Sequence, residues 1–121
     1  MRLLLSSIPP SANQLMRMHW AVKKRLRTTL QWELVRALHE IGHPLPPIAV
    51  NVKAPKRRLL IIAYRPRRFD LDNAYGGCKV LIDAMRDVGL IRNDSPKWLE
   101  LRVEQVVEPK RCRTEIEVED A

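Results

Sequence analysis

A long stretch of the chain repeats apolar residues at the three- and four-residue spacing of an amphipathic helix. This stretch runs from about Gln14 or Trp20 to Ile41, and Gly42 follows it directly. A glycine at the end of such a pattern, with prolines soon after it, stops a helix. We therefore expect one long helix with a single buried face, formed by Leu26, Leu30, Leu34, Ala37, Leu38 and Ile41.

A second helix is predicted from about Asn73 to Val88, and Gly89 closes it. Its buried stripe consists of Val80, Leu81, Ala84, Met85 and Val88. Gly76 and Gly77 oppose a helix near its start, because each glycine costs about 1 kcal/mol relative to alanine in a helix interior. The helix therefore begins either at about Asn73 or only after Gly77, with a loop before it.

Five short stretches have the alternating or continuous apolar pattern of β-strands. They are Arg2–Ser6, Ile48–Lys53, Leu59–Tyr64, Trp98–Val107 and Thr114–Glu119. A turn separates the second strand from the third and the fourth from the fifth, so we expect two hairpins. The order βα-ββ-α-ββ over residues 1–121 predicts a single small α+β domain with two main helices. Its sheet is expected to be mixed, mostly antiparallel, and of about five strands.

Charge is distributed unevenly along the chain, which has a net charge of +8. Residues 1–68 contain 14 Lys and Arg and only two acids, Glu33 and Glu40, whereas residues 69–121 contain 8 Lys and Arg and 12 acids. A basic protein of this kind often has an anionic partner. The second half adds nearly all the carboxylates, which makes a catalytic role more attractive than a merely basic surface.

Cellular location is suggested by two further features. Cys78 and Cys112 are too few for a disulfide framework, and we expect both to be reduced thiols of a cytoplasmic protein. Leu3-Leu4-Leu5 is too short for the apolar part of a signal peptide. No segment approaches the length needed to span a membrane, so no membrane partner is expected.

Two aspartates stand two residues apart behind the basic run Arg65-Pro66-Arg67-Arg68, in the sequence Asp70-Leu71-Asp72-Asn73. On extended backbone, side chains two residues apart point to the same face of the chain. Two carboxylates on one face supply the hard oxygen ligands that Mg²⁺ prefers. A metal beside several arginines indicates chemistry on a polyanion, and the phosphodiester backbone is the obvious candidate.

Two more residues are candidates for the same site. Asp94, in the loop after the second helix, joins the aspartates only if the strand that follows pairs near Asp70. Lys79, near the start of that helix, is placed to stabilise negative charge that develops on a phosphate. The metal hypothesis therefore combines Asp70, Asp72 and Asp94 as ligands with Lys79 as a cationic partner.

The same residues also have purely structural interpretations. Asp72 or Asn73 can cap the following helix, and Asn93-Asp94-Ser95 before a proline is an ordinary turn sequence. His39 and His43 stand four residues apart, as zinc ligands on a helix do, but a glycine and a proline interrupt the helix there. No third zinc ligand is evident, so we expect these histidines at a solvated helix end.

Basic side chains are expected to contact the phosphate backbone if the metal site is present, and otherwise to be solvated. The candidates are Lys23, Lys24, Arg27, Lys56, Arg57, Arg58, Arg65, Arg67 and Arg68. Trp20, Trp32 and Trp98 can stack on bases, although packing in the core or in a dimer is the stronger default for such side chains.

A set of motifs spread over most of the chain resembles the RusA family of Holliday junction resolvases. Asp70-Leu71-Asp72-Asn73 is followed by Lys79, by Asp83-Ala84-Met85 and by Gly89-Leu90-Ile91-Arg92-Asn93-Asp94. Pro9-Pro10-Ser11-Ala12-Asn13 is similar to the family's opening turn. Asp-x-Asp-Asn alone would be weak evidence, whereas the combination is specific.

The resemblance implies a small homodimeric endonuclease that requires Mg²⁺, or Mn²⁺ in its place, and cuts four-way DNA junctions by symmetric nicking. Such enzymes act in DNA recombination and repair in bacteria and prophages. By position, Asp70, Asp72 and Asp94 look like the family's metal-binding aspartates and Lys79 like its catalytic lysine. Asn73 and Asp83 look like supporting residues, with Asp83 one helical turn from Lys79.

The chain departs from this pattern at two places. Tyr75-Gly76-Gly77 lengthens the interval between Asn73 and Lys79. Asn93 also stands where the pattern has a second acid. Other functions therefore stay open: a nuclease for other branched DNA such as forks or flaps, a non-catalytic DNA-binding protein whose acids only cap helices, or a basic RNA-binding protein of ribosomal type.

Overall fold

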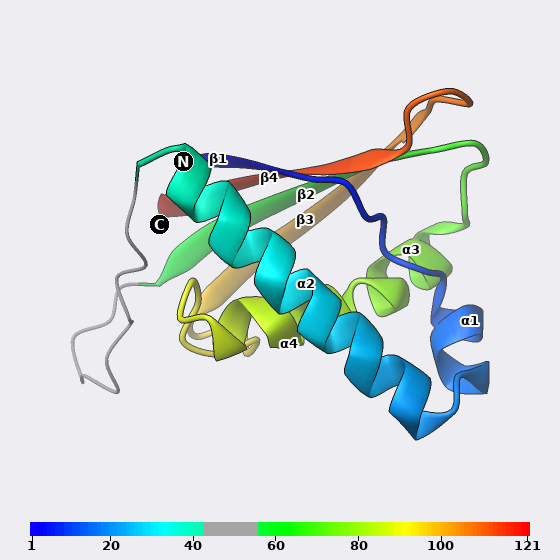
Figure 1. The fold of residues 1–121 in the computed structure, drawn as a ribbon. Helices are drawn as coiled ribbons and strands as arrows, with labels where there is room; N and C mark the ends of the chain where they lie inside the picture. The colour runs from blue at the N-terminus through cyan, green and yellow to red at the C-terminus, as the bar shows by residue number, and fades with distance from the viewer. Residues whose placement is uncertain (43–55) are drawn as a thin grey trace.

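Four strands form one sheet in the computed structural model, which describes residues 1–42 and 56–121 (Figure 1). They are β1 (Arg2–Leu5), β2 (Arg57–Arg65), β3 (Leu99–Val107) and β4 (Arg113–Asp120), in the order β1-β4-β2-β3. β4 pairs antiparallel with β1 and β2, whereas β2 and β3 are parallel. The prediction of a mixed, mostly antiparallel sheet is confirmed. The predicted strand Ile48–Lys53, and with it the first hairpin, lies outside the described residues.

The predicted hairpin between the last two strands is wrong. β3 lies at the edge of the sheet beside β2, with Leu99 opposite Arg57 and Val107 opposite Arg65, while β4 pairs on the other side of β2. Two helices between β2 and β3 return the chain to the end of the sheet where β2 began, as a parallel pair requires. The continuous apolar run of β2 thereby becomes an interior strand with a partner on each side.

Each predicted helical segment contains two helices. The first contains the short α1 (Ala12–Arg17), capped by Ser11, and the long α2 (Trp20–Glu40), capped by His19, so the later of the two expected starts is confirmed for the long helix. The second becomes α3 (Leu71–Gly77) and α4 (Lys79–Asp87), which meet at Cys78. The second helical segment therefore begins before the two glycines, and the break follows them.

Gly77 is required by a close approach of two backbone segments. A Cβ atom built at Gly77 would lie 1.8 Å from the carbonyl oxygen of Pro10, a distance that no side chain tolerates. The two glycines thus allow α3 to pack against the segment before α1, and α1 itself packs on α3. This packing places Asn13 and the start of α3 side by side, since the Asn13 N–H donates to Asn73 Oδ1 at 3.3 Å.

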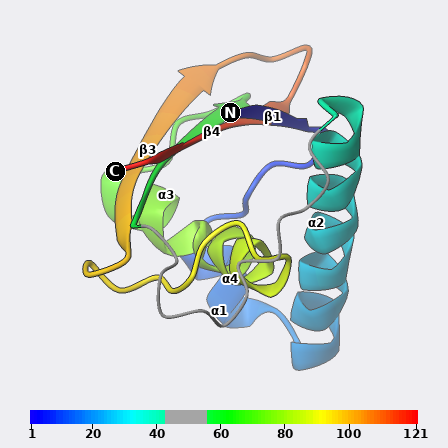
Figure 2. The ribbon, with the colours of Figure 1, turned by 90° about the vertical axis from the view of Figure 1, so that its left-hand side faces the viewer.

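The helices lie on one side of the sheet and enclose a single core (Figures 1 and 2). Alternate residues of β2 face this core, including Leu59 and Ile61, and α2 contributes Leu30 and Leu34. The opposite face of the sheet carries charged pairs such as Arg58 with Glu100 and Glu119. Within the described residues, no helix is both long enough and apolar enough to cross a bilayer.

Candidate functional site

Asp70 caps α3, a role that sequence reasoning had considered for its neighbours Asp72 and Asn73. Its backbone is extended, and its carboxylate accepts hydrogen bonds from the Asn73 N–H at 2.9 Å and from Asn73 Nδ2 at 3.0 Å. Such a cap satisfies an amide that has no partner within the helix. The aspartate is exposed, so its carboxylate remains open to solvent on its outer side.

Asp72 lies in the first turn of α3, not on extended backbone. The premise that placed Asp70 and Asp72 on one face of a strand is therefore wrong. A carboxylate in the first turn of a helix is favoured by the helix dipole. Asp70, Asp72 and Asn73 line a shallow depression of about 680 Å³, which Asn13 and Ala12 of α1 complete. Both carboxylates are thus available at one exposed surface.

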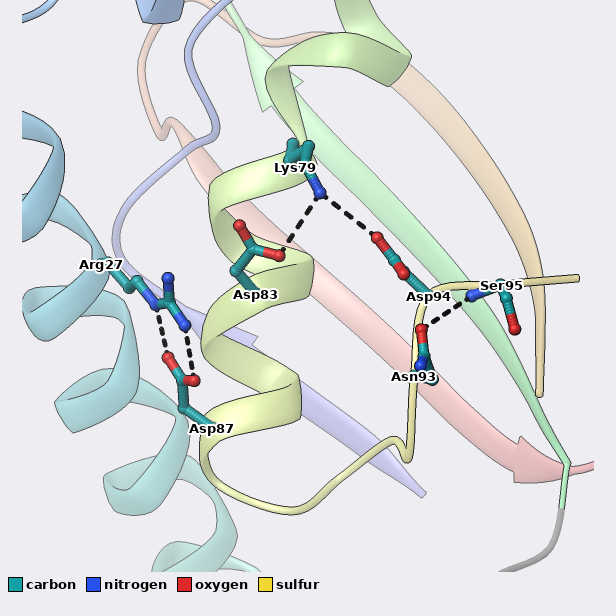
Figure 3. A network of polar contacts seen from close by, with 7 residues as sticks. All are labelled: Arg27, Lys79, Asp83, Asp87, Asn93, Asp94 and Ser95. Carbon is teal, nitrogen blue, oxygen red and sulfur yellow. Dashed lines mark hydrogen bonds and ion pairs between the residues drawn. The ribbon is translucent and has the colours of Figure 1, made fainter.

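Lys79, at the first position of α4, lies beside two carboxylates (Figure 3). Its Nζ is 3.2 Å from Asp94 Oδ2 and 3.5 Å from Asp83 Oδ1. The hydrogen bond and positive charge of Lys79 lower the pKa of Asp94. The predicted proximity of Asp83 to Lys79 is present, and the loop after α4 brings Asp94 to the same ammonium group.

The strand pairing that Asp94 would need in order to reach Asp70 does not occur. β3 begins at Leu99, opposite Arg57 at the start of β2, whereas Asp70 follows the other end of β2. Within residues 1–42 and 56–121, no group of three His, Cys, Asp or Glu side chains is arranged to hold a metal ion. The candidate residues therefore lie in two separate groups. Asp70 and Asp72 are at the start of α3, and Lys79 is at the start of α4 with Asp83 of the same helix and Asp94 of the loop that follows it.

The donor chemistry nevertheless fits Mg²⁺. Mg²⁺ keeps several waters and is commonly held by one or two carboxylates together with phosphate oxygens of the substrate. Asp70 and Asp72 are exposed carboxylates at one surface, and Asp94 is exposed beside Lys79. Asp70 and Asp72 fit an open site of this kind, and the described carboxylates do not form a closed cage of three.

The predicted DNA-binding residues fall into three groups. Lys23, Lys24, Arg67 and Arg68 are exposed and make no ion pair with any other described residue. Ion pairs hold Lys56, Arg57 and Arg58 on acids of β3 and β4. Arg27 forms an ion pair with an acid of another helix, and Arg65 is buried in the core.

Arg27 joins α2 to α4 through a bidentate ion pair with Asp87 (Figure 3). The two hydrogen bonds measure 2.5 and 2.6 Å, and Gln31 Nε2 donates a third to the same carboxylate at 2.6 Å. The hydrogen bond from Arg27 lowers the pKa of Asp87. The pair anchors the helix that begins with Lys79, so the role of Arg27 in this structure is to hold the site's framework.

Arg65 is buried, although it was expected to contact DNA. Its side chain faces the core at the end of β2, only 1% exposed, and lies 4.1 Å over the ring of Phe69. None of its three guanidinium nitrogens has a hydrogen-bond partner among the described residues. Burial lowers the pKa of Arg65 and raises the pKa of the neighbouring thiol, Cys78, to about 11.

Gln105 is a residue near the site that sequence reasoning did not assign to it. Its side-chain amide accepts from the Phe69 N–H at 2.8 Å and donates to the Phe69 carbonyl at 2.9 Å, directly before Asp70. Gln105 occupies an inward position of β3, in step with Leu101 and Val103. The sequence signal that could have identified Gln105 is its position as a polar residue in a row of apolar, inward-facing residues of a strand.

Comparison with known proteins adds no family assignment: no protein-family model matches the chain, and no curated protein matches it.

Proposed function

We propose that this protein is a Mg²⁺-dependent, structure-specific DNA endonuclease that resolves four-way junctions. The observation that carries the proposal is the meeting of Lys79, Asp83 and Asp94, which come from three separate pieces of the RusA resemblance. Two carboxylates within 3.5 Å of its Nζ give Lys79 a defined position. The exposed aspartates at the start of α3 and the exposed Lys23, Lys24, Arg67 and Arg68 supply the other groups that such a reaction needs.

Each residue has a definite part in the proposed reaction. The Lys79 ammonium stabilises negative charge on the phosphate oxygens, and Asp83 and Asp94 hold it in place. Asp70 and Asp72 would hold Mg²⁺ together with oxygens of the bound phosphate, and Mg²⁺ supplies Lewis-acid activation when bound. Lys23, Lys24, Arg67 and Arg68 contact the backbone of the arms. A homodimer would place one such site on each of the two related strands of a junction.

Cleavage of a synthetic four-way junction tests the proposal. We expect nicking at symmetric positions with Mg²⁺ or Mn²⁺, no nicking with EDTA, and little nicking of a linear duplex that has the same arm sequences. Faster cleavage of a forked or flapped substrate of matched length would identify that structure as the preferred substrate. Absence of nicking on every branched substrate with either metal would refute the enzymatic proposal.

A matched pair of variants tests whether Lys79 takes part in cleavage. Lys79→Gln is expected to lower the cleavage rate by about 100-fold or more, because removal of one charge-stabilising donor typically costs that much. Lys110→Gln removes the same charge from an exposed turn and should leave cleavage unchanged. Junction binding, measured in EDTA, should be similar for both variants. Equal cleavage by the two would exclude Lys79 from the reaction.

A non-catalytic DNA-binding protein is the second candidate. The capping role of Asp70 and the lack of a cluster of three acids among the described residues favour it. Asp72→Asn separates the two candidates, because the nuclease loses cleavage while it binds junctions as tightly as before or more tightly. A binding protein without catalysis shows no Mg²⁺-dependent nicking with either sequence.

A further inference from the structure

A groove of about 510 Å³ opens beside Lys79, where α1 and α2 meet α3 and α4. Leu15 and Met16 of α1 and Val80 of α4 line its apolar surface. Met16 is 80% exposed, which is unusual for a large apolar side chain at a concave surface. A volume of this size lies within the range of small-molecule and nucleotide sites.

The rim of the groove is strongly cationic. Lys23, Lys24, Arg27 and Lys79 line it, and Asp83 is the only acid among the described lining residues. Arg27 is occupied by Asp87, and Lys79 by Asp83 and Asp94. Lys23 and Lys24 are exposed and form no ion pair in the described part of the chain. Two cations therefore stand free at the edge of an apolar surface.

An apolar surface with a cationic edge matches one nucleotide that has left the base stack. Its base would lie against Leu15, Met16 and Val80, while its phosphate contacts Lys23 or Lys24. The same groove includes Lys79, so a nucleotide seated there has its backbone next to the proposed catalytic ammonium. A base within a duplex is unavailable, whereas an unpaired base costs the least to extrude.

We infer that this groove binds an unpaired nucleotide at the branch point of the DNA substrate. The inference rests on the proposed function for the identity of the substrate, and it adds a subsite to it. It predicts that the protein prefers branched DNA with one unpaired nucleotide over the same branched DNA with every base paired. We expect a preference of about tenfold, which corresponds to about 1.4 kcal/mol.

Binding measured by fluorescence anisotropy in EDTA tests this preference without cleavage. Two four-way junctions are compared, one fully paired and one with a single unpaired 2-aminopurine at the branch. Wild-type protein is expected to bind the second about tenfold more tightly and to change the emission of its 2-aminopurine. Equal affinity for the two junctions would overturn the inference.

Two pairs of variants locate the effect. Met16→Gln and Lys24→Gln are expected to bring the preference close to one, because they alter the apolar surface and the free cationic edge. Leu4→Gln, at an apolar position 57% exposed on β1, and Lys110→Gln should keep the wild-type preference. An equal preference in all four variants would overturn the assignment to this groove. All four substitutions lie at exposed positions, and their thermal unfolding provides the folding control.

The outcome is distinguishable from that of the cleavage test. If the protein prefers the unpaired nucleotide through Met16 and Lys24 but nicks no DNA, the inference about the groove stands and the nuclease proposal is wrong. If the protein cleaves junctions but shows no such preference, the nuclease proposal stands and the inference about the groove is wrong. Dissociation of a dimer by Met16→Gln, seen by sedimentation and without effect on the preference, would instead assign the groove to a second copy and overturn the inference.

Discussion

Replacement of Arg65 by methionine should stabilise the protein, even though it removes a charged residue next to the candidate site. The guanidinium is 1% exposed and has no acceptor among the described residues. Burial of an ion costs several kcal/mol in a folded protein, and an apolar side chain of similar volume avoids that cost. The stacking of Arg65 on Phe69 returns about 0.5–2 kcal/mol, which methionine recovers only in part.

The expected gain for Arg65→Met is therefore about 1–3 kcal/mol in the free energy of unfolding. For a chain of this length, the gain corresponds to a rise of roughly 4–12 °C in the melting temperature. Urea denaturation gives the free energy, and calorimetry gives the melting temperature. Arg67→Met, an exposed neighbour, is the matched control and should change stability by no more than about 0.5 kcal/mol.

A loss of stability in Arg65→Met would refute this reasoning. It would mean that the guanidinium has a partner of its own in solution, such as a buried water or an anion. In that case Arg65→Lys, which keeps the charge but loses the planar donor set, should also be destabilised. Stabilisation of the methionine variant, with Arg67→Met unchanged, would establish that Arg65 is an uncompensated charge in the core.

Two further predictions concern the framework of the site. Gly77→Ala should lower stability by about 3 kcal/mol or more, because its Cβ would lie 1.8 Å from the Pro10 carbonyl oxygen. Ala12→Gly, at the first position of α1 across the same helix pair, should cost no more than about 1 kcal/mol, and equal losses in urea denaturation would contradict the clash. Asp87→Asn should cost about 1 kcal/mol at pH 7 through loss of the Arg27 pair. The folded-state pKa of Asp87 is lowered, so its contribution is complete above the unfolded pKa of about 4 and is lost as pH falls through the folded pKa. The stability difference between wild type and Asp87→Asn should therefore be constant from pH 7 to about pH 5 and shrink below about pH 4, and a difference that persists unchanged at lower pH would contradict the assigned ion pair.

Much of the local structure was predictable because it depends on short-range chemistry. The apolar period of α2 and the glycine that ends it are features of consecutive residues, and the helix appears where they predict it. β1, β2, β3 and β4 likewise lie within a residue or two of their predicted bounds. The start of α4 just after Gly77 was one of the two predicted alternatives, whereas a separate helix, α3, in place of a loop before it was not predicted.

The candidate site was predictable residue by residue but not in its geometry. The spacing of Lys79 and Asp83 is a single helical turn, so their contact follows from local structure. Asp70 caps α3 because the helix begins at Leu71, and for the same reason Asp72 lies in the first turn of the helix and not on extended backbone. Asp94 does not reach Asp70 because β3 is parallel to β2: its first residue lies opposite Arg57 at the start of β2, whereas Asp70 follows the other end.

The sequence by itself determined α2, α4, the four described strands and the identity of the charged residues, because these depend on the order of apolar and polar side chains over short distances along the chain. Tertiary structure alone decided which of those residues meet. It buried Arg65, paired Arg27 with Asp87, and brought Asp94 to Lys79 across a gap of 15 residues. These outcomes depend on strand order and on helix packing over one face of the sheet, and distant segments set both through their fit in the shared core.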